Sequence, residues 1–458
     1  MARAMAAVGR RRGTTDVSVP AMVVGGLALT AGFVLLALVA MENATYDTWA
    51  TLFVTPVLIV VSLPVLTRQA AREGDRRLFW FLVAALVAKL VIGTFLRYFN
   101  TVEINGGTDS NKYHDAGLAL YQKFRDGNFD TSGLGDVTGT NFIRFVTGLV
   151  YAVTGPSRAS GFVVFSWLAF WGQFFFYRAF ALAVPEGRKR TYARFVFFLP
   201  SILFWPSSLG KEAWMMFGLG IAAYGVARIL TGSTVHGVVV AALGMWLAAF
   251  VRPYMPGMLA VGLAFGYVFL RTRDRHRELA PIVKVLSLSV LVVLSLILVA
   301  RSEEFLEERD VSTDEGVTST LGEVTRRSSQ GGSEFVPSVL KSPLQAPMAM
   351  FTVLFRPLVF EAHTPRALMS ALEGMFLFGL ALIRLPWILS ALKNLRHRPY
   401  VMAAFVYTGA FVFAFSSLAN FGQLVRQRSL LLPLAVLFLC IPATRRASSQ
   451  IEETRSHT

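Results

Sequence analysis

The chain carries the apolar segment LFWFLVAALVAKLVIGTFLR at residues 78–97, followed directly by the polar segment YFNTVEINGGTDSNKYHDAGLALYQKFRDGNFDTSGLGDVTGTN at residues 98–141. The apolar segment is long enough to cross a hydrocarbon core about 30 Å thick. The polar segment is one of only two long polar interruptions in a chain that is otherwise almost continuously apolar. This order predicts a membrane-spanning helix that delivers a long polar loop to one face of the membrane.

The composition of the chain is that of a membrane protein. Of its 458 residues, 54% are hydrophobic and 16% are charged, and the mean hydropathy is +0.54, which excludes an ordinary soluble protein. The net charge of +16 does not indicate nucleic-acid binding, because the positive residues cluster between the apolar runs, as they do in cytoplasmic loops. The single cysteine, Cys440, lies inside an apolar run, and we expect it to be a packing residue.

The apolar runs and the loop charges predict an all-α polytopic protein of the plasma membrane with about twelve transmembrane helices. Loops rich in Lys and Arg stay in the cytoplasm, and this rule places both termini inside and residues 98–141 outside. We expect no cleaved signal peptide, because the basic N-terminus leads into an apolar span without a small-residue cleavage site. The expected spans are residues 22–41, 51–67, 78–97, 159–184, 193–207, 211–230, 236–252, 255–271, 281–300, 366–388, 400–418 and 429–443.

Two apolar segments are predicted to lie in the membrane surface. Residues 142–154 would form a helix only about 20 Å long, which is too short to cross comfortably. Residues 347–363 are interrupted by Arg356-Pro357, and we interpret them as interfacial or re-entrant. In the first segment, the side chains expected to face lipid are Phe142, Phe145, Val146 and Leu149.

The loop at 98–141 contains the first candidate site, around Asp109. On a helix, Asp109 and Tyr113 share a face, and an apolar stripe predicts that this helix lies flat on the membrane surface. Asp109 is then either a general base or sugar-hydroxyl ligand at the lipid–water boundary, or simply an N-cap. His114 and Asp115 are either ligand contacts or surface residues of the helix. The stripe consists of Tyr113, Gly117, Leu120, Tyr121 and Phe124.

Further candidates lie at the predicted outer ends of later helices. Lys211 and Glu212 face the same compartment as Asp109, although a serine cap followed by a first-turn glutamate also stabilises a helix by itself. Four arginines occur there against the positive-inside bias, either to bind phosphate or to reach lipid headgroups. Lys89 and Glu373 lie deep in predicted spans, where charged side chains normally face a bundle interior or a cavity. The four arginines are Arg252, Arg356, Arg426 and Arg428.

The order of these residues resembles the GT-C superfamily of membrane glycosyltransferases, and within it the protein mannosyltransferase and aminoarabinose transferase branch. The resemblance covers about residues 78–230, from the outer-loop aspartate through a short amphipathic helix to a long span. The chain departs from the family in having two helices before the loop and in having Ser110 where a second acidic residue often follows the aspartate. The matching residues are Asp109, Tyr113, Gly117, Leu120, Gly127, Tyr151, Gly155 and Ser157.

The resemblance implies a glycosyltransferase that moves a sugar from a polyprenyl-phosphate donor to an extracytoplasmic saccharide or protein acceptor. It implies that Asp109 is catalytic and that Lys211 and Glu212 stand at the family's second acidic position, where we expect Glu212 to be catalytic and Lys211 to bind substrate. No nucleotide site is required. The family pattern also permits a divalent metal ion, which the sequence does not support because of Ser110, and we assign no metal ligand and no other cofactor.

Two other functions stay open at this point. A polysaccharide polymerase or ligase that acts on lipid-linked oligosaccharide would use the same outer arginines. A transporter or flippase would favour polar residues near the centres of several spans and an internal repeat. The chain has few deep polar residues, and we find no internal repeat. Under the leading hypothesis the chain divides into a helix pair at 1–77, a transmembrane core at 78–300 with a catalytic loop at 98–158, an acidic flexible outer loop at 301–346 and C-terminal helices at 347–458.

Overall fold

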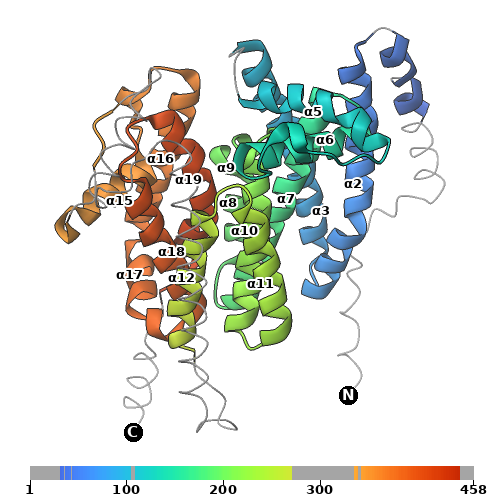
Figure 1. The fold of residues 1–458 in the computed structure, drawn as a ribbon. Helices are drawn as coiled ribbons and strands as arrows, with labels where there is room; N and C mark the ends of the chain where they lie inside the picture. Colours follow the sequence, from blue (N-terminus) through green and yellow to red (C-terminus); the bar gives the residue numbers. More distant parts are fainter. Residues whose placement is uncertain are drawn as a thin grey trace, which may run out of the picture.

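The computed structural model describes residues 31–35, 37–42, 44–104, 109–270, 335–338 and 342–443. Within these ranges the chain is helical and contains no strand (Figure 1). Six helices are long and apolar enough to cross a membrane, which confirms a helical membrane protein. The expected span at 281–300, residues 22–30 of the first expected span and most of the loop at 301–346 lie outside the described residues.

The six long helices correspond to six of the twelve expected spans, and other expected spans are shorter. The long helices are α2 (Tyr46–Glu73), the continuous helix Arg76–Ile104, α7 (Arg158–Ala183), α10 (Lys211–Leu230), α16 (Pro365–Ile383) and Phe421–Cys440, which comprises α19 (Phe421–Ala435) and η8 (Val436–Cys440). Shorter apolar helices stand at three more expected spans: α11 (Thr234–Ala249), α12 (Tyr254–Val268) and α18 (Pro399–Phe415). The segment interpreted as interfacial contains another short helix, α15 (Ala346–Phe355).

The helix that starts at Arg76 extends seven residues beyond the predicted end at 97. It consists of α3 (Arg76–Val87), η1 (Ala88–Gly93), α4 (Thr94–Phe99) and η2 (Asn100–Ile104), where η1 and η2 are π-helical. The polar residues after 97 remain helical because they pack against other helices. Tyr98 contacts Phe162 of α7 edge-to-face at 5.3 Å, and Thr101 is buried.

Prolines break two helices that we expected to be continuous. The expected span at 193–207 is divided at Pro200 into α8 (Lys189–Phe198) and α9 (Pro200–Phe204), and the expected helix at 366–388 ends at Ile383, before α17 (Leu385–Lys393) with Pro386 in its first turn. A proline lacks the backbone N–H and disfavours a helical residue before it. Leu199 accordingly adopts an extended ψ of 129°.

Two prolines that bound α9, Pro200 and Pro206, explain the deep polar residues, because they leave backbone groups inside the membrane that need new partners. The carbonyl of Ile202 lacks a helical partner because residue 206 is a proline, which has no N–H group. Lys89 donates to the carbonyl of Ile202 at 2.8 Å, and Gln173 donates to the same carbonyl at 3.2 Å. Glu373 accepts from the amide of Ser201 at 2.6 Å. These side chains therefore satisfy a broken helix, and a transport path is not needed to account for them.

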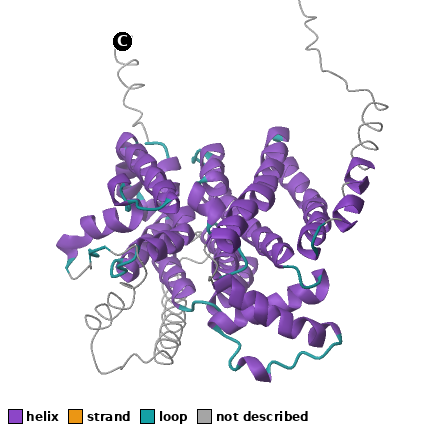
Figure 2. Cartoon of the chain, turned by 90° about the horizontal axis from the view of Figure 1, so that it is seen from above, coloured by secondary structure: helices purple, strands orange, loops and turns teal. Residues whose placement is uncertain are grey.

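The helices α5 (Asp109–Arg125) and α6 (Gly139–Thr154) lie across one end of the bundle and pack on each other (Figures 1 and 2). The apolar stripe of α5 was expected to face lipid, but Gly117 and Phe124 are buried against α6. The expectation that Phe142 faces lipid is also wrong, because its ring stacks on Phe250 at 4.8 Å. Amphipathic surface helices and helices packed on protein have the same hydrophobic pattern, so the sequence did not separate them.

A glycine contact between α7 and α10 sets the position of the candidate site, which begins at the first turn of α10. A Cβ atom on Gly172 would lie 2.1 Å from the carbonyl oxygen of Met216, and one on Gly220 would lie 2.2 Å from the carbonyl oxygen of Gly172. Small residues allow membrane helices to approach this closely, where dispersion contacts replace the hydrophobic effect as the stabilising force.

Substitution Gly172→Ala is expected to destabilise the protein by about 1–3 kcal/mol, because backbone atoms of α10 cannot rotate away from the new methyl group. The measurement is the unfolding midpoint in detergent. The matched control is Gly379→Ala in α16, where no atom lies within 4 Å of the added Cβ and no loss is expected, but a gain of up to about 1 kcal/mol, because alanine favours the helix. Equal stability of both variants would mean that α7 and α10 are not in close contact.

Candidate functional site

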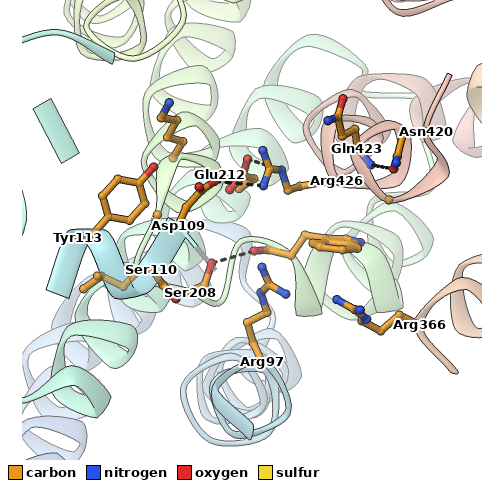
Figure 3. A pocket seen from close by; sticks show the side chains of 15 residues that line it. Arg97, Asp109, Ser110, Tyr113, Ser208, Glu212, Arg366, Asn420, Gln423 and Arg426 are labelled. Atoms are coloured by element: carbon orange, nitrogen blue, oxygen red, sulfur yellow. Dashed lines mark hydrogen bonds and ion pairs between the residues drawn. The ribbon is translucent and has the colours of Figure 1, made fainter. Parts of the chain in front are cut away.

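A cavity of about 330 Å³ opens at the end of the bundle that α5 crosses. Five parts of the chain form it: the end of α4, the start of α5, the turn from α9 to α10 with the first residues of α10, the start of α16 and the start of α19 (Figure 3). Its lining is mostly polar. The residues are Arg97, Asp109, Ser110, Tyr113, Trp205, Ser208, Leu209, Gly210, Lys211, Glu212, Arg366, Asn420, Gly422, Gln423 and Arg426.

Five residues predicted from the sequence meet in this cavity: Asp109, Tyr113, Lys211, Glu212 and Arg426. Asp109 is the first residue of α5, and its side chain is 61% exposed. Its ion-pair partner among the described residues is Arg426, whose Nη1 lies 3.7 Å from Asp109 Oδ2. At that distance the carboxylate is held only loosely, and it remains accessible to a ligand.

Glu212 lies at the centre of a buried ion cluster. Its Oε1 is 3.1 Å from Arg252 Nη2 and 3.0 Å from Arg426 Nε, and the side chains of Glu212 and Arg252 are almost fully buried. Arg252 also donates to Gln427 Oε1 at 2.6 Å. A buried carboxylate requires such partners. Arg252 itself does not line the cavity, so we assign to it and to Glu212 the role of fixing the Arg426 guanidinium beside Asp109.

The two carboxylates of the cavity do not fit a divalent metal ion. The guanidinium of Arg426 is ion-paired to both of them, which is where a shared cation would have to bind. Across the described residues, no group of three or more His, Cys, Asp or Glu side chains could hold a metal. We therefore derive no chemical step through a metal ion at this site.

The tyrosine that shares a face with Asp109 is buried against the first turn of α10. Only 2% of Tyr113 is exposed, and its ring lies 3.8 Å from where a Cβ of Gly210 would stand. Burial, together with the charges of Glu212 and Asp109, raises the pKa of the Tyr113 phenol. The hydroxyl group is therefore neutral at physiological pH and is able to donate a hydrogen bond.

Two arginines that sequence reasoning missed complete the cavity (Figure 3). Only 9% of Arg97 is exposed. Its guanidinium lies 4.8 Å from the ring of Trp205 and 5.1 Å from that of Phe204. Its Nε has no hydrogen-bond partner among the residues that the structure describes. Arg366 extends toward the same space from the start of α16. Both arginines lie at helix ends that the loop charges predict to be outside, so the signal used for the other arginines could have identified them.

The remaining predicted site residues lie outside the cavity. His114 Nδ1 is 2.7 Å from the hydroxyl of Tyr151, burial lowers the pKa of this histidine, and Asp115 is exposed to solvent. Arg356 pairs with Glu361.

The fourth predicted arginine, Arg428, is fully buried and forms hydrogen bonds with backbone carbonyl groups. It donates to the carbonyls of Leu354 at 3.0 Å and of Arg356 at 2.8 Å. Arg356 also lies 4.8 Å from the ring of Phe335. We therefore assign Arg356 and Arg428 to holding the turn after α15 and not to ligand binding, because Arg356 is paired with Glu361, Arg428 donates to backbone carbonyls, and neither lines the cavity.

Comparisons with known proteins give no further guide to this cavity: no family model, no curated protein and no solved structure matches the chain. The likeness to the GT-C superfamily remains a resemblance in residue order.

Proposed function

We propose that the protein is a membrane glycosyltransferase that moves a sugar from a polyprenyl-phosphate donor to an acceptor hydroxyl group. The observation that carries this proposal is the juxtaposition, in one cavity at the end of the membrane helices, of an accessible carboxylate on Asp109 with the guanidinium groups of Arg97, Arg366 and Arg426. A carboxylate serves as a base, and guanidinium groups suit phosphate oxygens.

The reaction uses the two sides of the cavity differently. Asp109 accepts the proton of the acceptor hydroxyl as that oxygen attacks the anomeric carbon of the donor. The bond between the anomeric carbon and the phosphate oxygen breaks, and the electron pair leaves with polyprenyl phosphate. The negative charge that accumulates on this leaving group is stabilised by Arg97 and Arg366, while Glu212 and Arg252 keep Arg426 in place.

An apolar groove next to the cavity supports a donor with a lipid chain. The groove has a volume of about 670 Å³ and lies between α8, α9 and α16, with a mostly apolar lining that includes Pro200, Met369 and Phe376. Met369 is one helical turn from Arg366 and packs beside Phe204 and Trp205 at the wall of the cavity. A phosphate bound near Arg366 would therefore have an apolar path for its chain.

The loop charges support an extracytoplasmic site in a multi-pass protein of the plasma membrane. The turn between α2 and α3 and the turn before α8 lie at the end of the bundle opposite to α5 (Figure 1). Both turns are rich in arginine and lysine, and such loops are kept in the cytoplasm. The acceptor, a saccharide or a protein, would then approach from outside.

A polymerase or ligase that uses a lipid-linked oligosaccharide shares this chemistry and differs only in its acceptor. A flippase differs more fundamentally, because it leaves the bond between sugar and phosphate intact. The deep polar residues Lys89, Gln173 and Glu373 bond to backbone groups near Pro200, and this supports an enzyme over a flippase.

The test is covalent chemistry by the purified protein. The protein is reconstituted into liposomes with a panel of polyprenyl-phosphate sugars labelled in both sugar and phosphate, and with candidate acceptors. We expect at least one donor to release sugar-free polyprenyl phosphate. Movement of an intact donor between leaflets without cleavage would support a flippase instead.

The substitution Arg97→Lys is expected to lower kcat/KM for transfer about tenfold and to leave the unfolding midpoint unchanged. A lysine keeps the positive charge over the aromatic rings but loses the planar, two-pronged contact with phosphate. The matched control is Arg356→Lys, because Arg356 also lies over two aromatic rings, those of Phe335 and Phe421, yet lies outside the cavity. An unchanged kcat/KM in Arg97→Lys would remove Arg97 from the donor site.

A further inference from the structure

A second cavity, of about 480 Å³, lies at the other end of the helices. The continuous helix Arg76–Ile104 connects the two cavities: Arg97 lines the first and Arg77 the second, about 30 Å apart along the helix axis. The second cavity is formed by the turn between α2 and α3, the first turns of α8 and one side chain of α7. Its lining is Glu73, Asp75, Arg77, Leu78, Phe81, Tyr177, Lys189, Arg190, Ala193 and Arg194.

Both carboxylates in this lining already have partners. Glu73 accepts hydrogen bonds from the hydroxyl of Tyr177, at 3.0 Å and 2.9 Å, and from Gln69 Nε2 at 2.6 Å. Asp75 accepts from Arg190 Nη2 at 2.7 Å. The Arg190 guanidinium and the neighbouring backbone amides lower the pKa of Asp75. Neither carboxylate is therefore left to neutralise the other cations of the cavity.

Three cations remain, from two different helices. The side chains of Arg77, Lys189 and Arg194 have no hydrogen bond or ion pair with another described residue, unlike Arg190. Arg77 belongs to the first turn of α3, Lys189 is the first residue of α8 and Arg194 lies further along α8. Like charges that line one cavity repel each other unless an anion binds between them.

The wall of the cavity identifies the kind of anion. Leu78 and Ala193 are buried, and Phe81 lines the cavity beside them, so an apolar surface extends from the cations along α3 and α8. The helix Arg76–Ile104, which includes α3, is apolar enough to cross a membrane, and Ala193 and Val196 of α8 belong to the hydrophobic core. This surface therefore leads from the membrane boundary toward the membrane interior. A ligand that fits has a phosphate group at one end and an apolar portion at the other.

We propose that this cavity binds the phosphate headgroup of an anionic phospholipid in the leaflet opposite the candidate site. The phosphate lies among Arg77, Lys189 and Arg194, and the acyl chains follow Leu78 and Phe81. A soluble phosphate anion would use the same cations but would leave the apolar wall uncovered. The inference does not depend on the proposed transfer reaction.

The experiment measures binding of phosphatidylglycerol, phosphatidylcholine and inorganic phosphate to the delipidated full-length protein by native mass spectrometry and competition. We expect phosphatidylglycerol to bind in preference to phosphatidylcholine, with inorganic phosphate competing only weakly. The triple substitution Arg77→Gln, Lys189→Gln, Arg194→Gln is expected to weaken phosphatidylglycerol binding about a hundredfold, because each lost cation weakens binding about fivefold.

The matched control removes three neighbouring charges that do not line the cavity, through Arg68→Gln, Arg72→Gln and Arg76→Gln. All three of these arginines are exposed on the same pair of helices, and we expect less than about a fivefold loss. A second variant, Arg77→Lys with Arg194→Lys, keeps the charge and should retain binding even if the glutamine variant unfolds. Equal losses in the cavity and control triples would overturn the proposal, as would equal affinity for phosphatidylcholine or tighter binding of inorganic phosphate.

Discussion

Replacement of Asp109 by asparagine is expected to reduce sugar transfer by at least about a hundredfold, which is the usual contribution of a general base. The asparagine side chain occupies the same space but cannot accept the proton of the acceptor hydroxyl. The substitution should change the free energy of unfolding by less than about 1 kcal/mol, because Asp109 is largely exposed and its ion pair with Arg426 is long, at 3.7 Å. Transfer rate and unfolding midpoint are measured on the same preparation.

Asp115→Asn provides the matched control for Asp109→Asn. Asp115 is an exposed carboxylate on the same helix, but it does not line the cavity, so both activity and stability should be unchanged. If Asp109→Asn instead keeps its activity while Asp109→Ala loses about 1 kcal/mol of stability, Asp109 is only a helix-capping residue, because asparagine caps a helix as well as aspartate does. The proposed base would then have to be sought elsewhere.

Replacement of Glu212 by glutamine is expected to be the most destabilising single change in the site, at about 3–5 kcal/mol. Removing one partner of a buried ion pair leaves the other charge buried without compensation. Here the loss affects two guanidinium groups, those of Arg252 and Arg426, which lie 3.1 Å and 3.0 Å from Glu212 Oε1. Transfer should fall as well, since Arg426 is no longer fixed beside Asp109.

The control for Glu212→Gln is Glu186→Gln. Glu186 also forms an ion pair with an arginine, Arg398, at 3.0 Å, but its side chain is 41% exposed. Exposed pairs contribute about 0–1 kcal/mol, so this variant should unfold almost like the unmodified protein. Comparable small losses in both variants would show that water reaches Glu212 and that the cluster is not a buried one.

Much of the fold and part of the site could be predicted because they depend on local patterns. Apolar runs of about twenty residues mark membrane helices, and the structure has α2, α7 and α10 where such runs occur. The four-residue spacing of Asp109 and Tyr113 placed both on one face of a helix, and both line the cavity. Lys211, Glu212 and Arg426 were predicted from their position at helix ends expected to be outside, and they also line the cavity.

The failures of prediction concern interactions between distant parts of the chain. The charge pattern could not separate Arg426, which lines the cavity, from Arg428, two residues later, which donates to the carbonyls of Leu354 and Arg356. In the sequence, Arg97 was simply the last residue of an expected span. Its cation–π contact with Trp205 depends on how α4 packs beside α9. The sequence of α5 showed that one side of the helix is hydrophobic, but it did not show that α6 covers that side.

The most direct test of the donor site is a cryo-electron microscopy structure of the protein in lipid nanodiscs supplied with polyprenyl phosphate, the product that every such donor would leave behind. We predict that the phosphate lies between the guanidinium groups of Arg97 and Arg366, with the prenyl chain passing Met369 into the groove along α16. A phosphate bound away from both arginines, with the cavity beside Asp109 empty, would contradict the proposed site.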